Sequence, residues 1–206
     1  MNGFIKQLPI AIEQKNILNK EQCDIVNKIV SEKKKNNTNN VLNIMCFRDT
    51  NNLDFTFKHS DDIEYLYKDN KLDILYEVFK KYIKNNKAYQ YFSNILGVYN
   101  KRDDLYKDIC DKTHDQYSVM PHKDSSLHYT PLKVFVLYTR IPSNFEGGEL
   151  KIYSDYDRND DVTIKPEIGK LISFDGRLMH SITKFKCDEG EYRESVVWEV
   201  YGKEHN

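Results

Sequence analysis

The second half of the chain breaks into short apolar runs separated by turn-forming residues. The runs are rich in β-branched and aromatic residues, and they cover residues 117–120, 134–138, 149–153, 162–164, 170–174, 181–185 and 195–201. Short strands at near-regular spacing between turn signals are typical of a β-sandwich or barrel. The sequence therefore predicts a β-rich core over residues 116–201.

The first half of the chain carries helical patterns. Cys23, Val26 and Val30 form an apolar stripe at helical spacing within residues 21–31, and Asn19 with Gln22 is placed to form a capping box at the start. A second helix is predicted to open at Asp69 or Asn70. Its apolar residues recur at spacings of three and four: Leu72, Leu75, Phe79, Tyr82 and Ile83.

Three further segments of the first half are predicted less uniquely. Residues 41–47 and 54–57 suit strands, and residues 88–99 suit a helix and a strand about equally because Gly97 and many aromatics interrupt the apolar pairs. The pattern indicates an α+β fold, with N-terminal helices packed on one sheet of a jelly-roll-like core. With 206 residues we expect one domain, in which residues 1–115 supply helical support and outer strands.

Charge and cysteine usage exclude several classes. The net charge of -1 comes from 31 basic and 32 acidic residues, so no global field favours nucleic acid or an anionic membrane. We expect neither as a partner. Residues 1–18 lack the apolar stretch of a signal peptide, and no segment suggests a membrane span. The four cysteines show no CxxC spacing, which favours reduced thiols and a cytoplasmic location.

A set of polar residues in the strand-rich half points to a metal site. In an extended segment His122 and Asp124 project to one face, and His180 opens a later strand. Two imidazoles and one carboxylate hold ferrous iron on one face and leave other positions open. His128 is the competing ligand. The remaining histidines, predicted to be exposed to solvent, are His59, His114 and His205.

An arginine downstream of the second histidine is placed to bind an anion. Arg193 and Ser195 are two residues apart on a predicted strand, so they share a face. A guanidinium binds a carboxylate through two hydrogen bonds, and a hydroxyl adds another. The alternative is a surface salt bridge between Arg193 and Glu191 or Glu194.

Several motifs follow one another in a characteristic order. They are His122-Lys123-Asp124, Gly147-Gly148-Glu149-Leu150, Pro166-x-x-Gly169 leading to Phe174, His180, and Arg193-x-Ser195 with Trp198. Together they resemble a known family, the 2-oxoglutarate- and iron(II)-dependent dioxygenases, and in particular its prolyl-4-hydroxylase-like branch. The resemblance covers residues 116–201 well and the whole chain loosely, including an opening helix that starts near residues 17–23.

The resemblance implies a double-stranded β-helix (cupin-like) core and a set of site residues. It implies that His122, Asp124 and His180 bind Fe(II), that Arg193 with Ser195 binds the distal carboxylate of 2-oxoglutarate, and that Tyr117 is a further contact of this cosubstrate. The prolyl-4-hydroxylase-like branch often has lysine where this chain has arginine. Lys184 and Lys186 are therefore the alternatives to Arg193.

The same resemblance implies a hydroxylase that consumes O2 and 2-oxoglutarate, with ascorbate as an accessory reductant. Asp124 implies hydroxylation rather than halogenation, because halogenases of the family lack this carboxylate. A prolyl or other side chain in a protein or peptide is the first expectation for the substrate, and a free amino acid or small metabolite is the alternative. The alternative of another class is a non-catalytic, cupin-like binding module. The sequence does not predict the oligomeric state.

The loops around the expected site should select the substrate. They cover residues 125–131, 143–146 and 154–161, of which the last is acidic. An acidic loop would suit a cationic substrate, although a solvated hairpin tip is the simpler interpretation.

Overall fold

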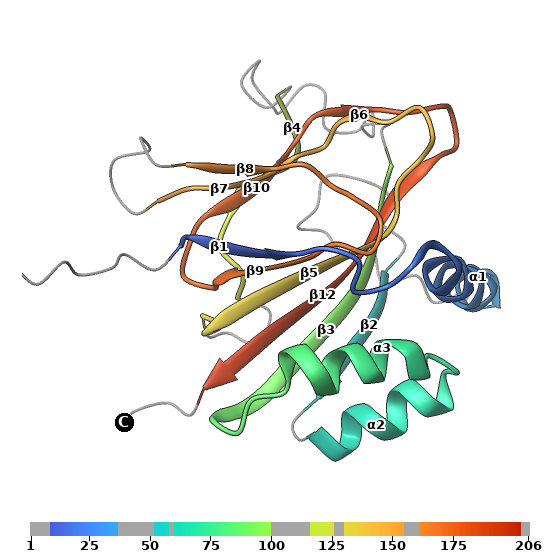
Figure 1. Cartoon of the computed structure of the whole chain (residues 1–206), viewed down its shortest axis with the longest axis vertical. Helices are drawn as coiled ribbons and strands as arrows, with labels where there is room; N and C mark the ends of the chain where they lie inside the picture. Colours follow the sequence, from blue (N-terminus) through green and yellow to red (C-terminus); the bar gives the residue numbers. More distant parts are fainter. Residues whose placement is uncertain are drawn as a thin grey trace, which may run out of the picture.

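The computed structural model of the chain describes residues 9–36, 52–57, 60–99, 116–125, 130–154 and 161–202. In this part of the chain most regular structure is strand (Figure 1). The strands are β1 (Ala11–Gln14), β2 (Asn52–Phe57), β3 (Ala88–Tyr99), β4 (Tyr117–His122), β5 (Lys133–Arg140), β6 (Glu146–Gly147), β7 (Leu150–Ile152), β8 (Val162–Ile164), β9 (Leu171–Asp175), β10 (His180–Thr183), β11 (Phe185–Lys186) and β12 (Tyr192–Gly202).

The strands form a six-stranded and a four-stranded sheet. The larger sheet has the order β1-β9-β5-β12-β3-β2, the smaller has the order β4-β10-β7-β8, and β11 pairs with β6. All pairs are antiparallel. From β4 onward the chain passes repeatedly between the two sheets: β5, β9 and β12 lie in the larger one, whereas β4, β7, β8 and β10 lie in the smaller one.

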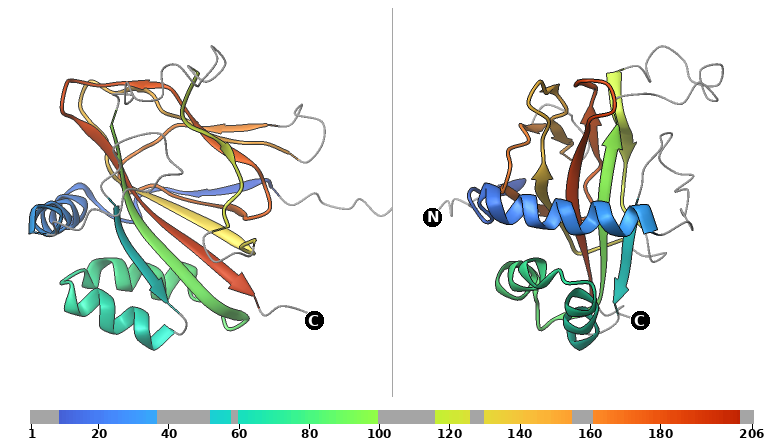
Figure 2. Two further views of the ribbon diagram at one scale, coloured as in Figure 1. Left: turned by 180° about the vertical axis from the view of Figure 1, so that it is seen from behind. Right: turned by 90° about the vertical axis from the view of Figure 1, so that its right-hand side faces the viewer.

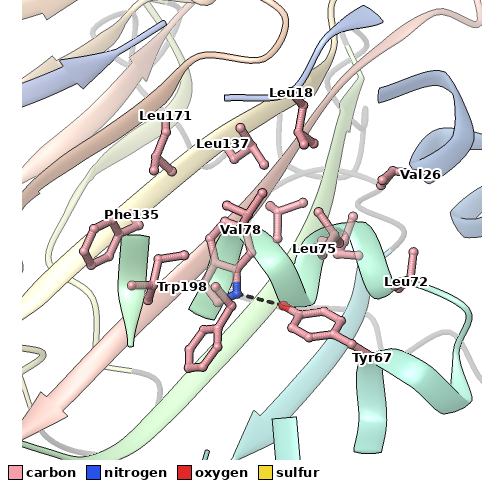
Figure 3. Packing of buried hydrophobic residues seen from close by; sticks show 14 of the residues in the cluster. Leu18, Val26, Tyr67, Leu72, Leu75, Val78, Phe135, Leu137, Leu171 and Trp198 are labelled. Atoms are coloured by element: carbon pink, nitrogen blue, oxygen red, sulfur yellow. Dashed lines mark hydrogen bonds between the residues drawn. The ribbon is translucent and has the colours of Figure 1, made fainter. Parts of the chain in front are cut away.

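Helices cover one face of the larger sheet. They are α1 (Lys20–Asn36), α2 (Ser60–Asp69) and α3 (Asp73–Val78), which continues into a π-helical turn over Phe79–Ile83. Figure 2 shows α1 running across the strands of this sheet. Apolar side chains of the helices pack with sheet residues such as Phe135, Leu137 and Trp198 (Figure 3). None of the described helices is long and apolar enough to cross a membrane.

A second core lies between the two sheets. It combines Val134, Val136 and Tyr138 of β5 with residues of β7, β8 and β9, among them Ile152 and Phe174. Alternation along a strand explains the division, because successive side chains point to opposite faces. The six-stranded sheet therefore has a helix face and an inner face, and the inner face looks toward the four-stranded sheet.

Most predicted elements are confirmed, with corrections at the helices. The capping box forms, since the Asn19 amide donates to Gln22 Oε1 and the Gln22 amide donates to Asn19 Oδ1, both at 2.9 Å. The prediction that a helix opens at Asp69 or Asn70 is wrong: α2 ends at Asp69, and α3 begins at Asp73. A positive φ of 60° at Lys71 breaks the chain between the two helices.

Several strand predictions also have clear outcomes. Residues 88–99 form a single strand, β3, and residues 54–57 belong to β2. Strands β1 and β6 were not predicted. The antiparallel pairing of β7 with β8 confirms the hairpin on either side of residues 154–161. The strand predicted over residues 41–47 lies outside the described residues.

Candidate metal and cosubstrate site

The three predicted metal ligands lie together at the ends of two neighbouring strands. His122 is the last residue of β4 and His180 the first of β10, and the two are direct partners in the strand pairing. Their rings are 4.4 Å apart between centroids. Asp124 follows β4 by two residues, beyond the strand rather than within it. The ligand atoms of the three residues all lie within 4.8 Å of one another.

The Asp124 carboxylate lies between the two rings. Its Oδ1 is 3.5 Å from His122 Nε2, and its Oδ2 is 3.5 Å from His180 Nε2. His122 Nδ1 is 2.8 Å from the Met120 carbonyl oxygen, and His180 Nδ1 is 3.3 Å from that of Leu178. A carbonyl can only accept, so each Nδ1 is placed to donate a hydrogen, and when the rings are neutral both Nε2 lone pairs point toward the Asp124 carboxylate and can bind a cation there. Metal-binding histidines are commonly oriented by such contacts.

The electrostatics of this cluster suit a cation. Burial favours the protonated form of Asp124, yet the hydrogen bond with His122 and the charge of the imidazoles hold the pKa of Asp124 below its ordinary value. Burial lowers the pKa of His180. Asp124 Oδ2 is buried and receives no hydrogen bond among the described residues. A charged oxygen and two converging lone pairs are the donor set that binds ferrous iron.

Arg193 is a buried cation on the inner face of β12. Only 2% of its surface is exposed, and burial lowers the pKa of its guanidinium. Nη1 donates to the Gly148 carbonyl at 3.0 Å, whereas Nε has no hydrogen-bond partner within the part of the chain that the structure describes. The alternative salt bridges are not formed. Glu191 accepts from Arg140 at 2.7 Å, and Glu194 accepts from Thr139 at 3.2 Å.

Tyr138 lies beside this guanidinium, and no role was predicted for it. Its ring lies 5.1 Å from the Arg193 guanidinium, and its buried hydroxyl has no hydrogen-bond partner among the described residues. Burial raises the pKa of Tyr138, so the hydroxyl stays protonated and can donate. The sequence contained one signal, a tyrosine at an inward position of an apolar strand. A buried tyrosine hydroxyl normally has a hydrogen-bond partner, so this position implies a partner but does not name it. Two buried donors without acceptors therefore lie side by side.

The other predicted cosubstrate residues have distinct positions. Ser195 is buried on the same face as Arg193 and is the direct strand partner of Tyr138. The Tyr117 hydroxyl lies 3.4 Å from that of Tyr153, which is 2.9 Å from Ser181 Oγ. A contact between Tyr117 and 2-oxoglutarate stays a prediction.

The alternatives to the main site residues also have outcomes. Lys184 and Lys186 are both exposed, unlike Arg193, and neither reaches the inner face as a buried charge. His59, His114, His128 and His205 lie outside the described residues.

Comparison with known proteins places the fold. The sequence matches no protein-family model and no curated protein. Among solved structures, a prolyl-4-hydroxylase from Pseudomonas putida is similar, with a TM-score of 0.57 and 12% identity over 95% of this chain and 94% of that chain. The chain has the fold of the 2-oxoglutarate- and iron(II)-dependent oxygenases.

Two further structures show the same fold. A prolyl hydroxylase from Trichoplax adhaerens, in complex with a peptide fragment of the hypoxia inducible factor oxygen degradation domain, has a TM-score of 0.51 and 14% identity, covering 94% of this chain and 84% of that one. An oxidoreductase of the 2OG-Fe(II) oxygenase family from Burkholderia pseudomallei has a TM-score of 0.51 and 10% identity, covering 93% and 84%.

Proposed function

We propose that this chain is an Fe(II)- and 2-oxoglutarate-dependent dioxygenase that hydroxylates an amino-acid side chain, prolyl or other, in a protein or peptide. One observation supports the proposal: three residues that could hold a metal ion, and a buried arginine without a carboxylate partner among the described residues, lie on the inner side of the two sheets. A buried guanidinium is costly unless an anion compensates it. The peptide-bound neighbour from Trichoplax adhaerens supports a peptide substrate.

The residues have separate roles in this proposal. His122, Asp124 and His180 would hold ferrous iron on one face, which leaves the opposite positions for ligands. The bound iron, with 2-oxoglutarate and O2, supplies the oxidising chemistry that converts a C–H bond to C–OH and releases succinate and carbon dioxide. The protein binds and orients the substrate and the cosubstrate, and it excludes water from the site. Asp124 would be the third ligand, and a carboxylate at that position favours hydroxylation over halogenation.

The cosubstrate carboxylate would be bound at the other part of the site. Arg193 Nε and the Tyr138 hydroxyl are donors that have no acceptor among the described residues, and Ser195 lies beside them. A carboxylate placed here would accept hydrogen bonds from both donors and neutralise the buried charge.

The architecture supports two related inferences. We infer that the alternation of β4–β12 between the sheets forms a double-stranded β-helix, and that residues 1–206 form one catalytic domain with its core at 116–201. A cytoplasmic location remains a prediction from the cysteine pattern.

An anaerobic titration tests the proposal. Adding ferrous iron and 2-oxoglutarate should produce a weak visible charge-transfer band, and the band should vanish in His180→Ala. Asp175→Ala is the control, since this carboxylate pairs with the exposed Arg177 at 2.5 Å and should leave the band intact. A wild-type protein that gives no band, and no succinate with any peptide or amino-acid pool, would indicate a non-catalytic binding module instead.

A further inference from the structure

The hydrogen bond that holds the Arg193 guanidinium comes from a single peptide group. Arg193 Nη1 donates to the Gly148 carbonyl at 3.0 Å, and the same peptide group carries the amide N–H of Glu149. A trans peptide is planar, so its carbonyl and its N–H point in opposite directions and turn together. Whatever fixes the Glu149 N–H therefore also fixes the oxygen that receives the guanidinium.

A side chain of the neighbouring strand binds this N–H. The Glu149 amide donates to Thr183 Oγ1 at 2.9 Å, while the Thr183 amide donates to the Glu149 carbonyl at 3.0 Å. The two residues lie opposite each other, one position beyond the pair of Leu150 with Ile182. In a regular hydrogen-bonded pair both residues exchange backbone N–H···O bonds. Here the Thr183 hydroxyl takes the place of the Thr183 carbonyl as the acceptor.

The backbone at Gly148 explains this exchange. Gly148 has a φ of 70°, in the left-handed region that favours glycine. The strand pairing keeps its register across this point, since the pair of Gly147 with Phe185 lies three residues along both strands from that of Leu150 with Ile182. The peptide after Gly148 is thus rotated within a continuous pairing. Its carbonyl turns toward Arg193, and its N–H turns toward the threonine hydroxyl.

The Glu149 carboxylate completes a chain of hydrogen bonds. The Thr183 hydroxyl donates to Glu149 Oε2 at 2.5 Å. A hydroxyl has one hydrogen, so this donation leaves its lone pairs for the Glu149 N–H. All three bonds run in one direction: guanidinium to carbonyl, amide to hydroxyl, hydroxyl to carboxylate. Hydrogen bonds in such a chain polarise and strengthen one another inside a protein. Arg193 stands at the cationic end and Glu149 at the anionic end.

This chain anchors one part of the guanidinium and leaves another part available. Nη1 of Arg193 is bound by the Gly148 carbonyl, whereas Nε has no hydrogen-bond partner among the described residues. A guanidinium recognises a carboxylate through a fixed, planar arrangement of donors, so its orientation decides whether the two can pair. A side chain that is already held in the binding orientation loses less conformational freedom when the ligand arrives.

We propose that Thr183 and Glu149 are positioning residues that orient Arg193 toward the cosubstrate, and that they thereby set the preference of the site for a 2-oxo acid with a distal carboxylate. This inference rests on the proposed function and adds two residues to the same site. They act through the peptide between Gly148 and Glu149, and neither side chain contacts the cosubstrate.

Two 2-oxo acids of equal chain length test this assignment. 2-Oxoglutarate carries the distal carboxylate, and 2-oxopentanoate has a methyl group in its place. Their dissociation constants are measured on protein loaded with Mn(II) in place of Fe(II), and their ratio measures the preference for the distal carboxylate. Thr183→Val keeps the shape of the side chain and removes the hydroxyl, so the ratio should fall by roughly 5- to 15-fold. A general loosening of the site would instead weaken the binding of both acids equally.

Three further variants make the comparison specific. Thr183→Ser retains the hydroxyl and should keep most of the preference. Glu149→Gln retains the backbone bonds and an acceptor oxygen but removes the charge, so the ratio should fall by a smaller factor, roughly 2- to 5-fold. Thr163→Val is the control, because Thr163 is an exposed threonine on β8 of the same sheet and pairs with Lys151. It should leave the ratio at the wild-type value.

The outcomes separate this inference from the proposed function. If the wild-type protein binds metal and 2-oxoglutarate, an unchanged ratio in Thr183→Val overturns the positioning role alone. So does an equal loss for both acids, or a loss of the same size in Thr183→Ser or Thr163→Val. If Thr183→Val does not fold, Glu149→Gln decides, and an unchanged ratio in that variant overturns the role.

A measurement without ligands covers the remaining case. A wild-type protein that binds neither metal nor 2-oxo acid overturns the proposed function. Hydrogen exchange of the Arg193 N–H groups, followed by NMR on the unliganded protein, then decides the positioning role. Exchange should be faster in Thr183→Val than in the wild type and in Thr163→Val, because the guanidinium is no longer held by an oriented carbonyl. Equal exchange in all three proteins overturns the inference.

Discussion

Arg193 occupies a position where a positive charge is unfavourable until an anion arrives. We predict that Arg193→Ala weakens the binding of 2-oxoglutarate by about 2–4 kcal/mol of binding free energy and leaves the affinity for iron almost unchanged. Equilibrium titration with 2-oxoglutarate and, separately, with Fe(II) measures both. Arg140→Ala is the control, since Arg140 pairs with Glu191. An unchanged affinity for 2-oxoglutarate would show that Arg193 does not bind this carboxylate.

Tyr138 offers a test that separates binding from folding. Tyr138→Phe keeps the ring and removes a buried hydroxyl that lacks a partner among the described residues. We predict that the unliganded protein is as stable as wild type or more stable, because the removed group is desolvated without compensation. The affinity for 2-oxoglutarate should fall by about 0.5–1.5 kcal/mol. Thermal unfolding and 2-oxoglutarate titration measure the two effects, and a drop in stability without loss of affinity would contradict the assignment.

At the residue scale, the sequence predicted the site residues that form a motif along the chain. It missed the residues whose role depends on which side of a sheet their side chains face. The metal ligands could be proposed as a set, because an HxD motif and a histidine at the start of a strand can both be recognised in the linear sequence. They are His122, Asp124 and His180. Tyr138 is the last residue of an apolar run, and nothing local distinguishes a tyrosine that faces a guanidinium from one that fills a core. Thr183 ends a strand, and its hydrogen bond with the Glu149 amide depends on the pairing of two strands that are distant in sequence.

Two glycines at β6 determine the backbone around Arg193. Gly147 and Gly148 have φ values of 81° and 70°, and the Gly148 carbonyl accepts the hydrogen bond from Arg193. A Cβ at Gly147 would lie 2.3 Å from the carbonyl oxygen of Lys184, the residue just before β11, which pairs with β6. The two glycines therefore allow β6 to pack closely against this segment, and they also orient the Gly148 carbonyl toward Arg193.

We predict that Gly147→Ala destabilises the protein and weakens 2-oxoglutarate binding. A side chain in the left-handed region costs about 1–2 kcal/mol, and the clash adds to this cost and displaces the Gly148 carbonyl. Gly190→Ala is a matched control, because Gly190 has a φ of 80° and a Cβ there would meet nothing within 4 Å. Urea unfolding with 2-oxoglutarate titration compares the two variants. Equal losses of stability and no change in affinity for either variant would contradict this role of Gly147.

A helix or strand could be predicted from the sequence where the interactions that define it are made between residues close together in the chain. The capping box at Asn19 and Gln22 named the start of α1 correctly, because both hydrogen bonds are made within four residues. The boundary between α2 and α3 was missed, since Asp69 is a good helix-starting residue that in fact lies at a helix end. β3 was ambiguous because its identity comes from pairing with β12 and β2, which are distant in sequence.

At the scale of the whole molecule, the larger sheet has a helix-packed core on one face and the proposed site residues on the other. Its helix face packs against α1, α2 and α3, and its inner face carries Arg193, Tyr138 and Ser195. A hydrogen-bonded chain lies within the helix-face core. Trp198 Nε1 donates to the Tyr67 hydroxyl at 2.7 Å (Figure 3), and that hydroxyl lies 3.0 Å from Ser93 Oγ. This chain joins α2 to two central strands. Changes there should affect folding and leave the site intact.

Tyr67→Phe tests this separation. The substitution keeps the ring but leaves the buried Trp198 N–H without its acceptor, which typically costs about 1–3 kcal/mol. We predict a lower urea midpoint with an unchanged slope, as expected for a loss of stability without a change in the surface exposed on unfolding. The affinities for Fe(II) and 2-oxoglutarate should match wild type, because the helix face has no contact with the proposed ligands. Tyr65→Phe on the same helix is the control: this side chain is 69% exposed and should have no effect on the midpoint. A weaker 2-oxoglutarate affinity in Tyr67→Phe at full folding would show that the two faces of the sheet are coupled.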